Sequence, residues 1–171
     1  RDFCERIGVA KANSMVDVGL LEHCVREDLK LKVESRNVIE NPIKIVITNY
    51  PEDQTEEMEI ENNREVPEMG NRMVPFSREL YVDGDDFMEV PVKKYFRLFP
   101  GNEVRFKGAY FITCNDVIKN EDGRIKELHC TYDPETRSGS GFEGRKVKGT
   151  IHWVDAKTAV QIKIRNYDHL M

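Results

Sequence analysis

The sequence predicts a mainly β protein in which a short α-helical subdomain precedes two small antiparallel β-barrels. Three observations support this fold class. After a helical opening, short stretches rich in β-branched and aromatic residues recur, with turn residues between them. The turns follow one another about every eight to twelve residues, which is typical of small barrels. The 171 residues, of which 39% are apolar, suffice for one large or two small cores.

The N-terminal part has the periodicity of two helices. Phe3, Ile7 and Ala10 recur at helical spacing, and Gly8 provides a weak point or stop. We expect the second helix to begin after a cap at Asn13 or Ser14, whose short side chains can accept hydrogen bonds from its first N–H groups. Its apolar stripe, which we expect to pack on a neighbouring element, consists of Val18, Leu21, Val25 and Leu29.

The pattern changes to strands from residue 36 onward. Residues 43–48 are rich in β-branched side chains and predict a strand. The acidic stretch 52–68 predicts an exposed hairpin or loop, part of which can form an edge strand, because charge on an edge discourages unwanted pairing. Residues 79–82 predict another strand, and residues 83–86 a turn.

A second series of strands follows. We expect strands at residues 95–99, 103–107, 110–114, 117–119, 125–132, 148–153 and 160–165, and one helical turn at 156–159. Strand 103–107 alternates polar and apolar residues. This alternation places Arg105 and Lys107 on one face and Val104 and Phe106 on the other.

The net charge of −5 hides a strong asymmetry along the chain. Residues 51–89 carry three basic and thirteen acidic side chains, a net of −10, whereas residues 90–171 carry fifteen basic and ten acidic ones, a net of +5. Attraction to phosphate depends on the local face that a protein presents. The overall charge therefore does not exclude a nucleic-acid partner for the C-terminal half.

Catalytic and metal chemistry find little support in the sequence. The four cysteines lie far apart without a Cys-x-x-Cys pair, which predicts a reduced, cytosolic protein without a disulfide or zinc site. The glycines of residues 139–144 precede a basic strand, not the helix N-terminus that a phosphate loop requires. No apolar run approaches the roughly 20 residues that cross a bilayer. The chain also starts on Arg1, inside a helix, so we expect a piece of a longer protein that is inert on its own.

Residues 93–107 combine positive charge with aromatic rings. Five cations stand against one anion, Glu103. The cations are Lys93, Lys94, Arg97, Arg105 and Lys107, and the aromatic residues are Tyr95, Phe96, Phe99 and Phe106. Single-stranded RNA recognition uses such cations for phosphates and base edges and such rings for unstacked bases. A solvated barrel face with its aromatic side chains turned inward is the alternative that the pattern leaves open.

Six motifs make the chain similar to the C-terminal anticodon-binding region of bacterial-type glutaminyl-tRNA synthetases. They are, in chain order, Arg1–Val9, Pro67–Gly70, Val74–Ser77, Cys130–Thr136, Gly144–Val154 and Tyr167–Asp168. The resemblance implies barrels of the anticodon-binding, ribosomal-protein-like type. It also implies a helical subdomain at residues 1–34, a proximal barrel at 35–92 and a distal barrel at 93–171. The proximal barrel would be partial, with an exposed edge that could self-associate.

The resemblance also implies roles for individual residues. Arg97 would contact the third anticodon base, a guanine in glutamine anticodons, whose O6 and N7 match the arginine fork. Arg105 and Lys107 would hold the first base and its phosphate. Arg36 would read the second base, a uracil, although the equivalent position in some members falls on Ser35.

Weaker backbone contacts complete the expected interface. The resemblance places Lys11 on the sugar-phosphate backbone inside the bend of the tRNA. Lys94, Arg145 and Lys146 are further candidates for phosphate contacts, while exposed cations of a glycine-bounded hairpin are an equally good explanation for the last two. Lys148 belongs to the same basic cluster.

The implied partners are tRNA(Gln) and an upstream catalytic domain of the same chain, and neither a membrane nor DNA. ATP would bind in that catalytic domain, so no cofactor is expected in the present residues. Two alternatives remain at this point. One is the anticodon-binding region of a glutamyl-tRNA synthetase, and the other is a barrel that binds ribosomal RNA or only protein.

Overall fold

The computed structural model describes residues 1–8, 11 and 13–166. The chain divides into two compact units. The first, called here the helical unit, comprises residues 1–36 and 61–72, and the second, the β unit, comprises residues 37–60 and those from 73 onward. Ala10 and the Tyr167–Asp168 motif lie outside the described residues.

The helical unit contains α1 (Asp2–Ile7) and α2 (Val18–Lys30). Gly8 ends α1 with a positive φ of 70°, as predicted. The predicted cap of the second helix is wrong: Asp17, not Asn13 or Ser14, accepts a hydrogen bond from the Gly19 N–H at 2.8 Å. Asp17 stands directly before the first residue of the apolar stripe, so capping and amphipathic pattern begin together.

The apolar stripe of α2 stays largely open to solvent. Leu21, Val25 and Leu29 are exposed by 42%, 48% and 45%. Together with Val33 they line a hollow of about 760 Å³ within the helical unit. The neighbour that we expected on this stripe is not among the described residues of that unit. Within the described part of the chain, neither helix is long and apolar enough to cross a membrane.

Asn63 closes the C-terminal end of α2. Its buried amide group donates to the carbonyl oxygens of Lys30 and Val33, both at 2.8 Å, and its Oδ1 accepts from the N–H groups of Glu65 and Val66. The last carbonyls of a helix have no partner inside the helix. The Asn63 side chain thus supplies hydrogen-bond donors to carbonyl groups at and just beyond the end of α2.

A seven-stranded sheet forms most of the β unit, with the strand order β8-β5-β6-β7-β1-β4-β9. Its strands are β1 (Pro42–Ile47), β4 (Glu79–Asp83), β5 (Glu103–Phe106), β6 (Phe111–Lys119), β7 (Ile125–Asp133), β8 (Thr150–Ile151) and β9 (Val154–Asp155). The mainly β fold class with a short helical part is therefore confirmed.

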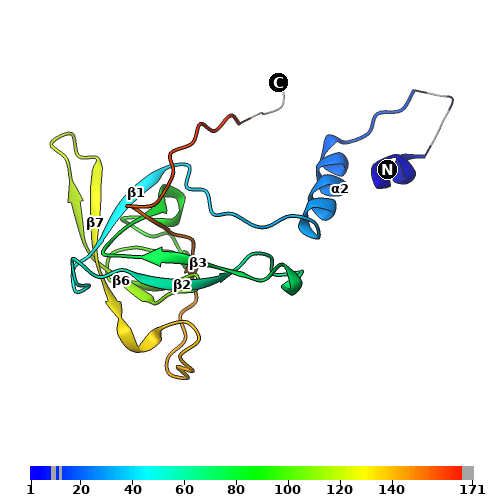
Figure 1. Cartoon of the computed structure of the whole chain (residues 1–171). Coiled ribbons are helices and arrows are strands. Elements are labelled where there is room, and N and C mark those ends of the chain that lie inside the picture. Colours follow the sequence, from blue (N-terminus) through cyan, green and yellow to red (C-terminus); the bar gives the residue numbers. More distant parts are fainter. Residues whose placement is uncertain (9–10, 12, 167–171) are drawn as a thin grey trace. The chain divides into compact units, whose positions relative to one another are not determined.

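The β6–β7 hairpin is the longest pair of the sheet and is drawn in green to yellow in Figure 1. β7 also pairs in parallel with β1, from Lys44 opposite Glu127 to Ile47 opposite Cys130. The side chain of Asn49 extends this ladder, since its amide group exchanges two hydrogen bonds of 2.9 Å with the backbone of Tyr132. This parallel pairing joins strands on both sides of residue 92 in one sheet, and the division into proximal and distal barrels stays a prediction.

A second, two-stranded sheet consists of β2 (Glu56–Glu61) and β3 (Asn71–Phe76). The acidic stretch 52–68 supplies the predicted strand, β2, and β3 follows it outside that stretch. The strand is not exposed on both faces, because Met58 and Ile60 are 2% and 3% exposed. They join a core with Phe76 and Trp153, whose rings meet edge to face at 5.1 Å. Val104 and Phe106 of β5 belong to the same core, so close packing holds the strand that carries Arg105 in a fixed position.

The strand predicted at residues 95–99 is wrong. Lys94 has a positive φ of 68°, and this segment contributes only an isolated bridge between Leu98 and Phe87. Leu98 is fully buried and donates its N–H to the backbone carbonyl oxygen of Asp86 at 3.0 Å. Buried Leu98 thus holds this segment through a single bridge and not through a series of strand hydrogen bonds. The side chains next to Leu98 project from irregular backbone and not from a strand.

Other strands also differ from the prediction. The segments 110–114 and 117–119 form one strand, β6, with a register shift between Cys114 and Asp116. The expected strand 148–153 shortens to β8, whereas residues 160–165 form no strand. Val160, Ile162 and Ile164 are exposed by 82%, 58% and 38%. Their alternation satisfies the pattern of a strand, but none of the strands in the described part of the chain pairs with them. A short turn does follow β9, closed by the Ala159 N–H on the carbonyl of Asp155 at 3.0 Å.

Candidate nucleic-acid interface

Arg97 lies at the edge of a shallow polar hollow of about 330 Å³. Its Nη1 donates to Asp86 Oδ1 at 2.8 Å and to the backbone carbonyl of Asp85 at 3.0 Å. The side chain remains 52% exposed, whereas that of Asp86 is only 15% exposed. Both contacts that Arg97 makes with described residues use the same nitrogen. The guanidinium is therefore anchored on one side and solvent-accessible on another.

The carboxylate beside Arg97 is partly desolvated. Burial raises the pKa of Asp86, and the positive charge of Arg97 opposes that rise. Asp83 lies in the same hollow, and its pKa is lowered by hydrogen bonds from the backbone N–H groups of Asp85, Glu40 and Asn41, against the effect of burial. The Asp86 carboxylate and the Asp85 carbonyl fix Arg97 in place, and the negative charges of Asp83 and Asp86 oppose the approach of a phosphate to this hollow.

Arg105 projects from the outer face of β5 and stacks on an aromatic ring. Its guanidinium carbon lies 4.3 Å from the centre of the Phe111 ring, and Phe111 is its direct partner on β6. Nη1 also lies 3.5 Å from the carbonyl oxygen of Thr136. Partial burial lowers the pKa of Arg105, which nevertheless stays charged at neutral pH. The alternation predicted for β5 is confirmed, because Val104 and Phe106 are fully buried.

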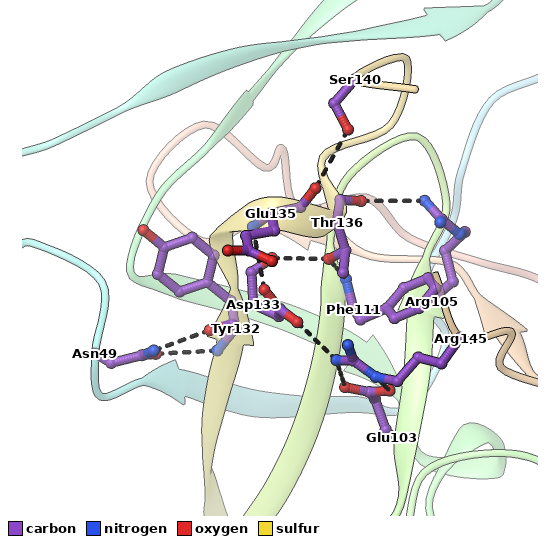
Figure 2. Close-up of polar contacts among 10 residues, drawn as sticks. All are labelled: Asn49, Glu103, Arg105, Phe111, Tyr132, Asp133, Glu135, Thr136, Ser140 and Arg145. Atoms are coloured by element: carbon purple, nitrogen blue, oxygen red, sulfur yellow. Dashed lines mark hydrogen bonds and ion pairs between the residues drawn. The ribbon is translucent and has the colours of Figure 1, made fainter. Parts of the chain in front are cut away.

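Arg145 approaches the same ring from the loop after β7 (Figure 2). Its Nε and Nη2 donate to the two oxygens of Glu103 at 2.8 and 2.5 Å, and Nη2 also donates to Asp133 at 2.7 Å. The guanidinium carbon lies 5.5 Å from the Phe111 ring. These carboxylates raise the pKa of Arg145. The predicted phosphate ligand is thus already neutralised by two carboxylates.

Thr136 completes this cluster from the turn that follows β7. Its buried hydroxyl accepts the backbone N–H of Phe111 and donates to the carbonyl of Asp133. Phe111 lies opposite Asp133 across β6 and β7. The cluster therefore runs across three neighbouring strands, from Arg105 through Phe111 to Asp133, and its geometry is set by sheet register.

Lys107 follows β5 and is partly exposed. Its backbone is held at both polar groups: the N–H donates to Ile151 at 3.0 Å, and the carbonyl accepts from the indole N–H of Trp153 at 3.0 Å. A cation on such a fixed backbone can hold a phosphate. Among the described residues, no hydrogen bond or ion pair engages its ammonium group.

Arg36 lies in the helical unit with a second arginine beside it. Its Nη2 pairs with Glu34, and its Nη1 lies 3.4 Å from Asn62 Oδ1. Arg72 donates to the same amide oxygen at 3.2 Å. Burial and the charge of Arg36 lower the pKa of Arg72. No pattern in the sequence indicated Arg72, because the two arginines are far apart in the chain. Ser35, the alternative to Arg36, is exposed and donates its backbone N–H to the backbone carbonyl oxygen of Asn62.

The weaker candidates Lys11, Lys94 and Lys146 are all exposed. Their exposure is compatible both with phosphate contacts and with ordinary solvation. Within the described residues, no cluster of three or more His, Cys, Asp or Glu side chains could hold a metal ion. All four cysteines are free, and Cys114 and Cys130 lie opposite each other in the core.

The aromatic residues of the basic segment separate into different environments. Phe106 is fully buried, and Tyr95 and Phe99 pack against each other with their ring centres 6.4 Å apart. Phe96 is 47% exposed. The alternative that the aromatic side chains of this segment turn inward thus holds for Phe106. Phe96 is the ring of this segment that remains available to a ligand.

Comparison with known proteins gives a family and several named relatives. The family model described as tRNA synthetases class I (E and Q), anti-codon binding domain, matches residues 36–133. The glutamine–tRNA ligase of Clostridium perfringens is 60% identical over 171 residues, which is 100% of this chain and 31% of the relative. The corresponding ligase of Clostridioides difficile is 59% identical with the same coverage.

A more distant bacterium gives a similar result. The glutamine–tRNA ligase of Bradyrhizobium diazoefficiens is 55% identical over 170 residues, or 99% of this chain and 30% of the relative. The chain spans about a third of the length of these curated relatives. The family match covers more than half of the chain, including β1, β5 and β6 with Arg97, Arg105 and Lys107. The chain therefore belongs to the anticodon-binding domain family of the class I (E and Q) tRNA synthetases.

Proposed function

We propose that this chain is the anticodon-reading region of a glutamine–tRNA ligase. The intact protein would join glutamine to tRNA(Gln) in the cytosol with ATP, which an upstream catalytic domain would bind. The observation that carries the proposal is the match of residues 36–133 to the anticodon-binding domain family. The names of relatives up to 60% identical to this chain favour glutamine over glutamate.

Arg97 is the residue to which we assign the third anticodon base. A guanine offers its O6 and N7 to the planar arginine fork, whereas cytosine at that position would present a donor instead. The contacts with Asp86 and Asp85 support this role, because they fix the side chain through Nη1 while half of it stays exposed. A pre-positioned guanidinium loses less conformational entropy on binding than a free one.

Arg105 and Lys107 would hold the first base and its phosphate. Stacking on Phe111 restricts the Arg105 guanidinium, and the backbone bonds to Ile151 and Trp153 fix the position of Lys107. Arg36, with Ser35 as the alternative, would contact the second base. The same proposal includes the division of the chain into a helical subdomain (residues 1–34), a proximal barrel (35–92) and a distal barrel (93–171).

Backbone contacts would come from Lys11, Lys94 and Lys146, which are exposed. For Arg145 we modify the sequence-based expectation. Its three hydrogen bonds to Glu103 and Asp133 make it a holder of the loop after β7. A phosphate could recruit it only after these carboxylates had been displaced.

The proposal is tested by measuring the affinity of the intact protein for anticodon stem-loops that differ only at the third base. The wild type should prefer guanine, and Arg97→Ala should cost about 1–3 kcal/mol with guanine and relax that preference. Lys163→Ala, an exposed cation outside the segment, is the matched control. A wild type indifferent to the third base would refute anticodon reading, and a preference for cytosine would assign the chain to glutamate.

A further inference from the structure

Phe96 is the most exposed aromatic side chain in the described part of the chain. It is 47% exposed, whereas the other described aromatic side chains are buried or half-buried. Exposing a large ring costs free energy, because apolar surface in contact with water is unfavourable. Single exposed apolar residues are common and carry no function by themselves. What surrounds Phe96 is therefore decisive.

A lysine from a distant part of the sequence lies over this ring. Lys148 Nζ is 5.0 Å from the centre of the Phe96 ring. Lys148 is itself exposed, so its charge remains accessible to solvent. The pair combines an aromatic surface with a cation that sits close to it. These are the two groups that bind the base and the phosphate of an unstacked nucleotide.

Gly149 fixes the two residues relative to each other. A Cβ atom at this position would lie 1.8 Å from the backbone oxygen of Phe96, so the two backbones are in direct contact. The carbonyl of Gly149 accepts the N–H of Arg105 at 2.9 Å, which ties the same spot to β5. Phe96 and Lys148 are therefore held by backbone packing next to the strand that carries Arg105.

The two segments that meet here are entirely cationic in their charged residues. Residues 90–102 contain Lys93, Lys94 and Arg97 and no acidic residue, and residues 144–150 contain Arg145, Lys146 and Lys148 and no acidic residue. Lys94, two residues before the exposed ring, has a positive φ of 68° and lies in a turn closed by the Tyr95 N–H on the Val92 carbonyl at 3.1 Å. Arg97 is paired with Asp86, and Arg145 is paired with Glu103 and Asp133. The charge that favours a polyanion over an apolar protein partner therefore comes from the lysines of these two segments.

We propose that Phe96 and Lys148 form a stacking site for one unstacked nucleobase of the bound tRNA, with Lys148 holding the adjoining phosphate. This inference rests on the proposed function and names a base contact in addition to Arg97, Arg105 and Arg36. Stacking is tolerant of base identity, since every base has a π-face. The site therefore contributes affinity and holds the loop open, while the arginines supply the sequence preference.

The first test measures the affinity of the intact protein for the glutamine anticodon stem-loop. Phe96→Ala should weaken binding about tenfold, which is within the range reported by alanine substitution at stacking residues. Phe96→Tyr should remain within about twofold of the wild type, because the ring is kept. Val92→Ala, which shortens another exposed apolar side chain of the segment, should have no effect. A loss that tyrosine does not restore would overturn the stacking role.

The second test uses stem-loops in which each loop nucleotide in turn is abasic. At one position the missing base should weaken wild-type binding about tenfold, and there Phe96→Ala should cause no further loss. An equal effect of Phe96→Ala with every abasic loop would assign the loss to misfolding and overturn the inference. Lys148→Gln should lower the salt dependence of binding by about one phosphate contact.

Failure of this inference and failure of the proposed function give different results. If the wild type prefers guanine at the third base while Phe96→Ala binds normally, only the stacking site is refuted. If Phe96→Ala is coupled to one abasic position while the wild type ignores the third base, the stacking site stands and the anticodon reader does not. If neither effect is seen, both are wrong.

Discussion

Arg105 lies directly opposite Phe111 across β5 and β6, with its guanidinium carbon 4.3 Å from the centre of the ring. Phe111 is only 3% exposed, so its ring serves as a fixed surface on which the arginine rests. Cross-strand partners on one face of an antiparallel sheet are the closest side-chain neighbours that it provides. Sheet register thereby decides the position of a side chain to which we assign RNA binding.

This relationship predicts a measurable coupling between the two residues. In a double-mutant cycle of Arg105→Lys and Phe111→Leu, the free energy of unfolding should show a coupling of about 0.5–1 kcal/mol, because leucine keeps apolar bulk but not the π-face. Urea denaturation of the four proteins measures it. The pair Arg124→Lys and Phe111→Leu, whose members do not contact each other, should be additive. Additivity in the first cycle as well would contradict a stacking contribution.

The Asp133–Arg145 contact predicts a specific loss of stability in acid. The hydrogen bond from Arg145 lowers the pKa of Asp133 below its ordinary value of 3.8. Since the folded-state pKa is the lower one, the stabilisation is present above about pH 4 and disappears as the pH falls through the folded-state pKa. Unfolding measured between pH 2 and pH 6 should therefore be less pH-dependent in Asp133→Asn than in the wild type.

Asp122→Asn, an exposed carboxylate of the β6–β7 turn, is the control for this experiment. It should leave the pH dependence of unfolding unchanged. Parallel curves for wild type and Asp133→Asn would show that the ion pair does not contribute.

Gly149→Ala should destabilise the β unit severely. The added methyl group would lie 1.8 Å from the Phe96 backbone oxygen, and backbone atoms cannot move aside as a flexible side chain can. We expect a loss of about 3 kcal/mol or more, measured as a shift of the urea midpoint. Gly139→Ala, which has φ +82° but open space around it, should cost only about 1 kcal/mol. Similar costs for the two variants would mean that the close approach at Gly149 is not real.

Glu56 joins two buried tyrosines of the core. Its two carboxylate oxygens each accept a phenol hydroxyl at 2.8 Å, one from Tyr50 and one from Tyr110. Burial raises the pKa of each phenol most, and the hydrogen bond to Glu56 raises it further. Glu56→Ala removes a shared acceptor and should cost about 2–4 kcal/mol of unfolding free energy. The Tyr110 hydroxyl loses its acceptor, and the Tyr50 hydroxyl keeps only the Phe76 carbonyl oxygen at 3.4 Å.

The neighbouring Glu57 is exposed and provides the control. Glu57→Ala should change the unfolding free energy by less than about 0.5 kcal/mol. A small effect of Glu56→Ala, in the range of this control, would show that other acceptors replace the carboxylate.

Asn63 predicts a sharp difference between asparagine and aspartate. Aspartate is nearly isosteric, but it replaces two N–H donors with a carboxylate that faces the carbonyls of Lys30 and Val33. The negative end of the helix dipole adds to this repulsion. Asn63→Asp should therefore accelerate amide hydrogen exchange in α2, corresponding to about 2 kcal/mol of local stability. The control Asn13→Asp, in an exposed segment, should leave amide hydrogen exchange in α2 unchanged. Unchanged exchange in Asn63→Asp as well would contradict the role of Asn63 at the end of α2.

The sequence alone was sufficient where neighbours in the chain are also neighbours in space. The alternation of residues 103–107 predicted which side chains of β5 face outward, and the turn around Gly123 predicted the β6–β7 hairpin. Gly8 ended α1 for a local reason as well, since glycine adopts positive φ without steric cost. The basic and aromatic composition of residues 93–107 and the family motifs likewise located the candidate interface before any contact was known.

Only the tertiary structure decided which of these side chains are free and which are engaged. Arg145 and Lys94 look alike in sequence, yet one is held by two carboxylates from β5 and β7 and the other is exposed. The parallel β1–β7 pair, the Arg36–Arg72 neighbourhood and the Phe96–Lys148 contact each join residues at least 36 positions apart. Periodicity reports the faces of a single element, whereas such contacts depend on how strands far apart in the chain close loops and pair.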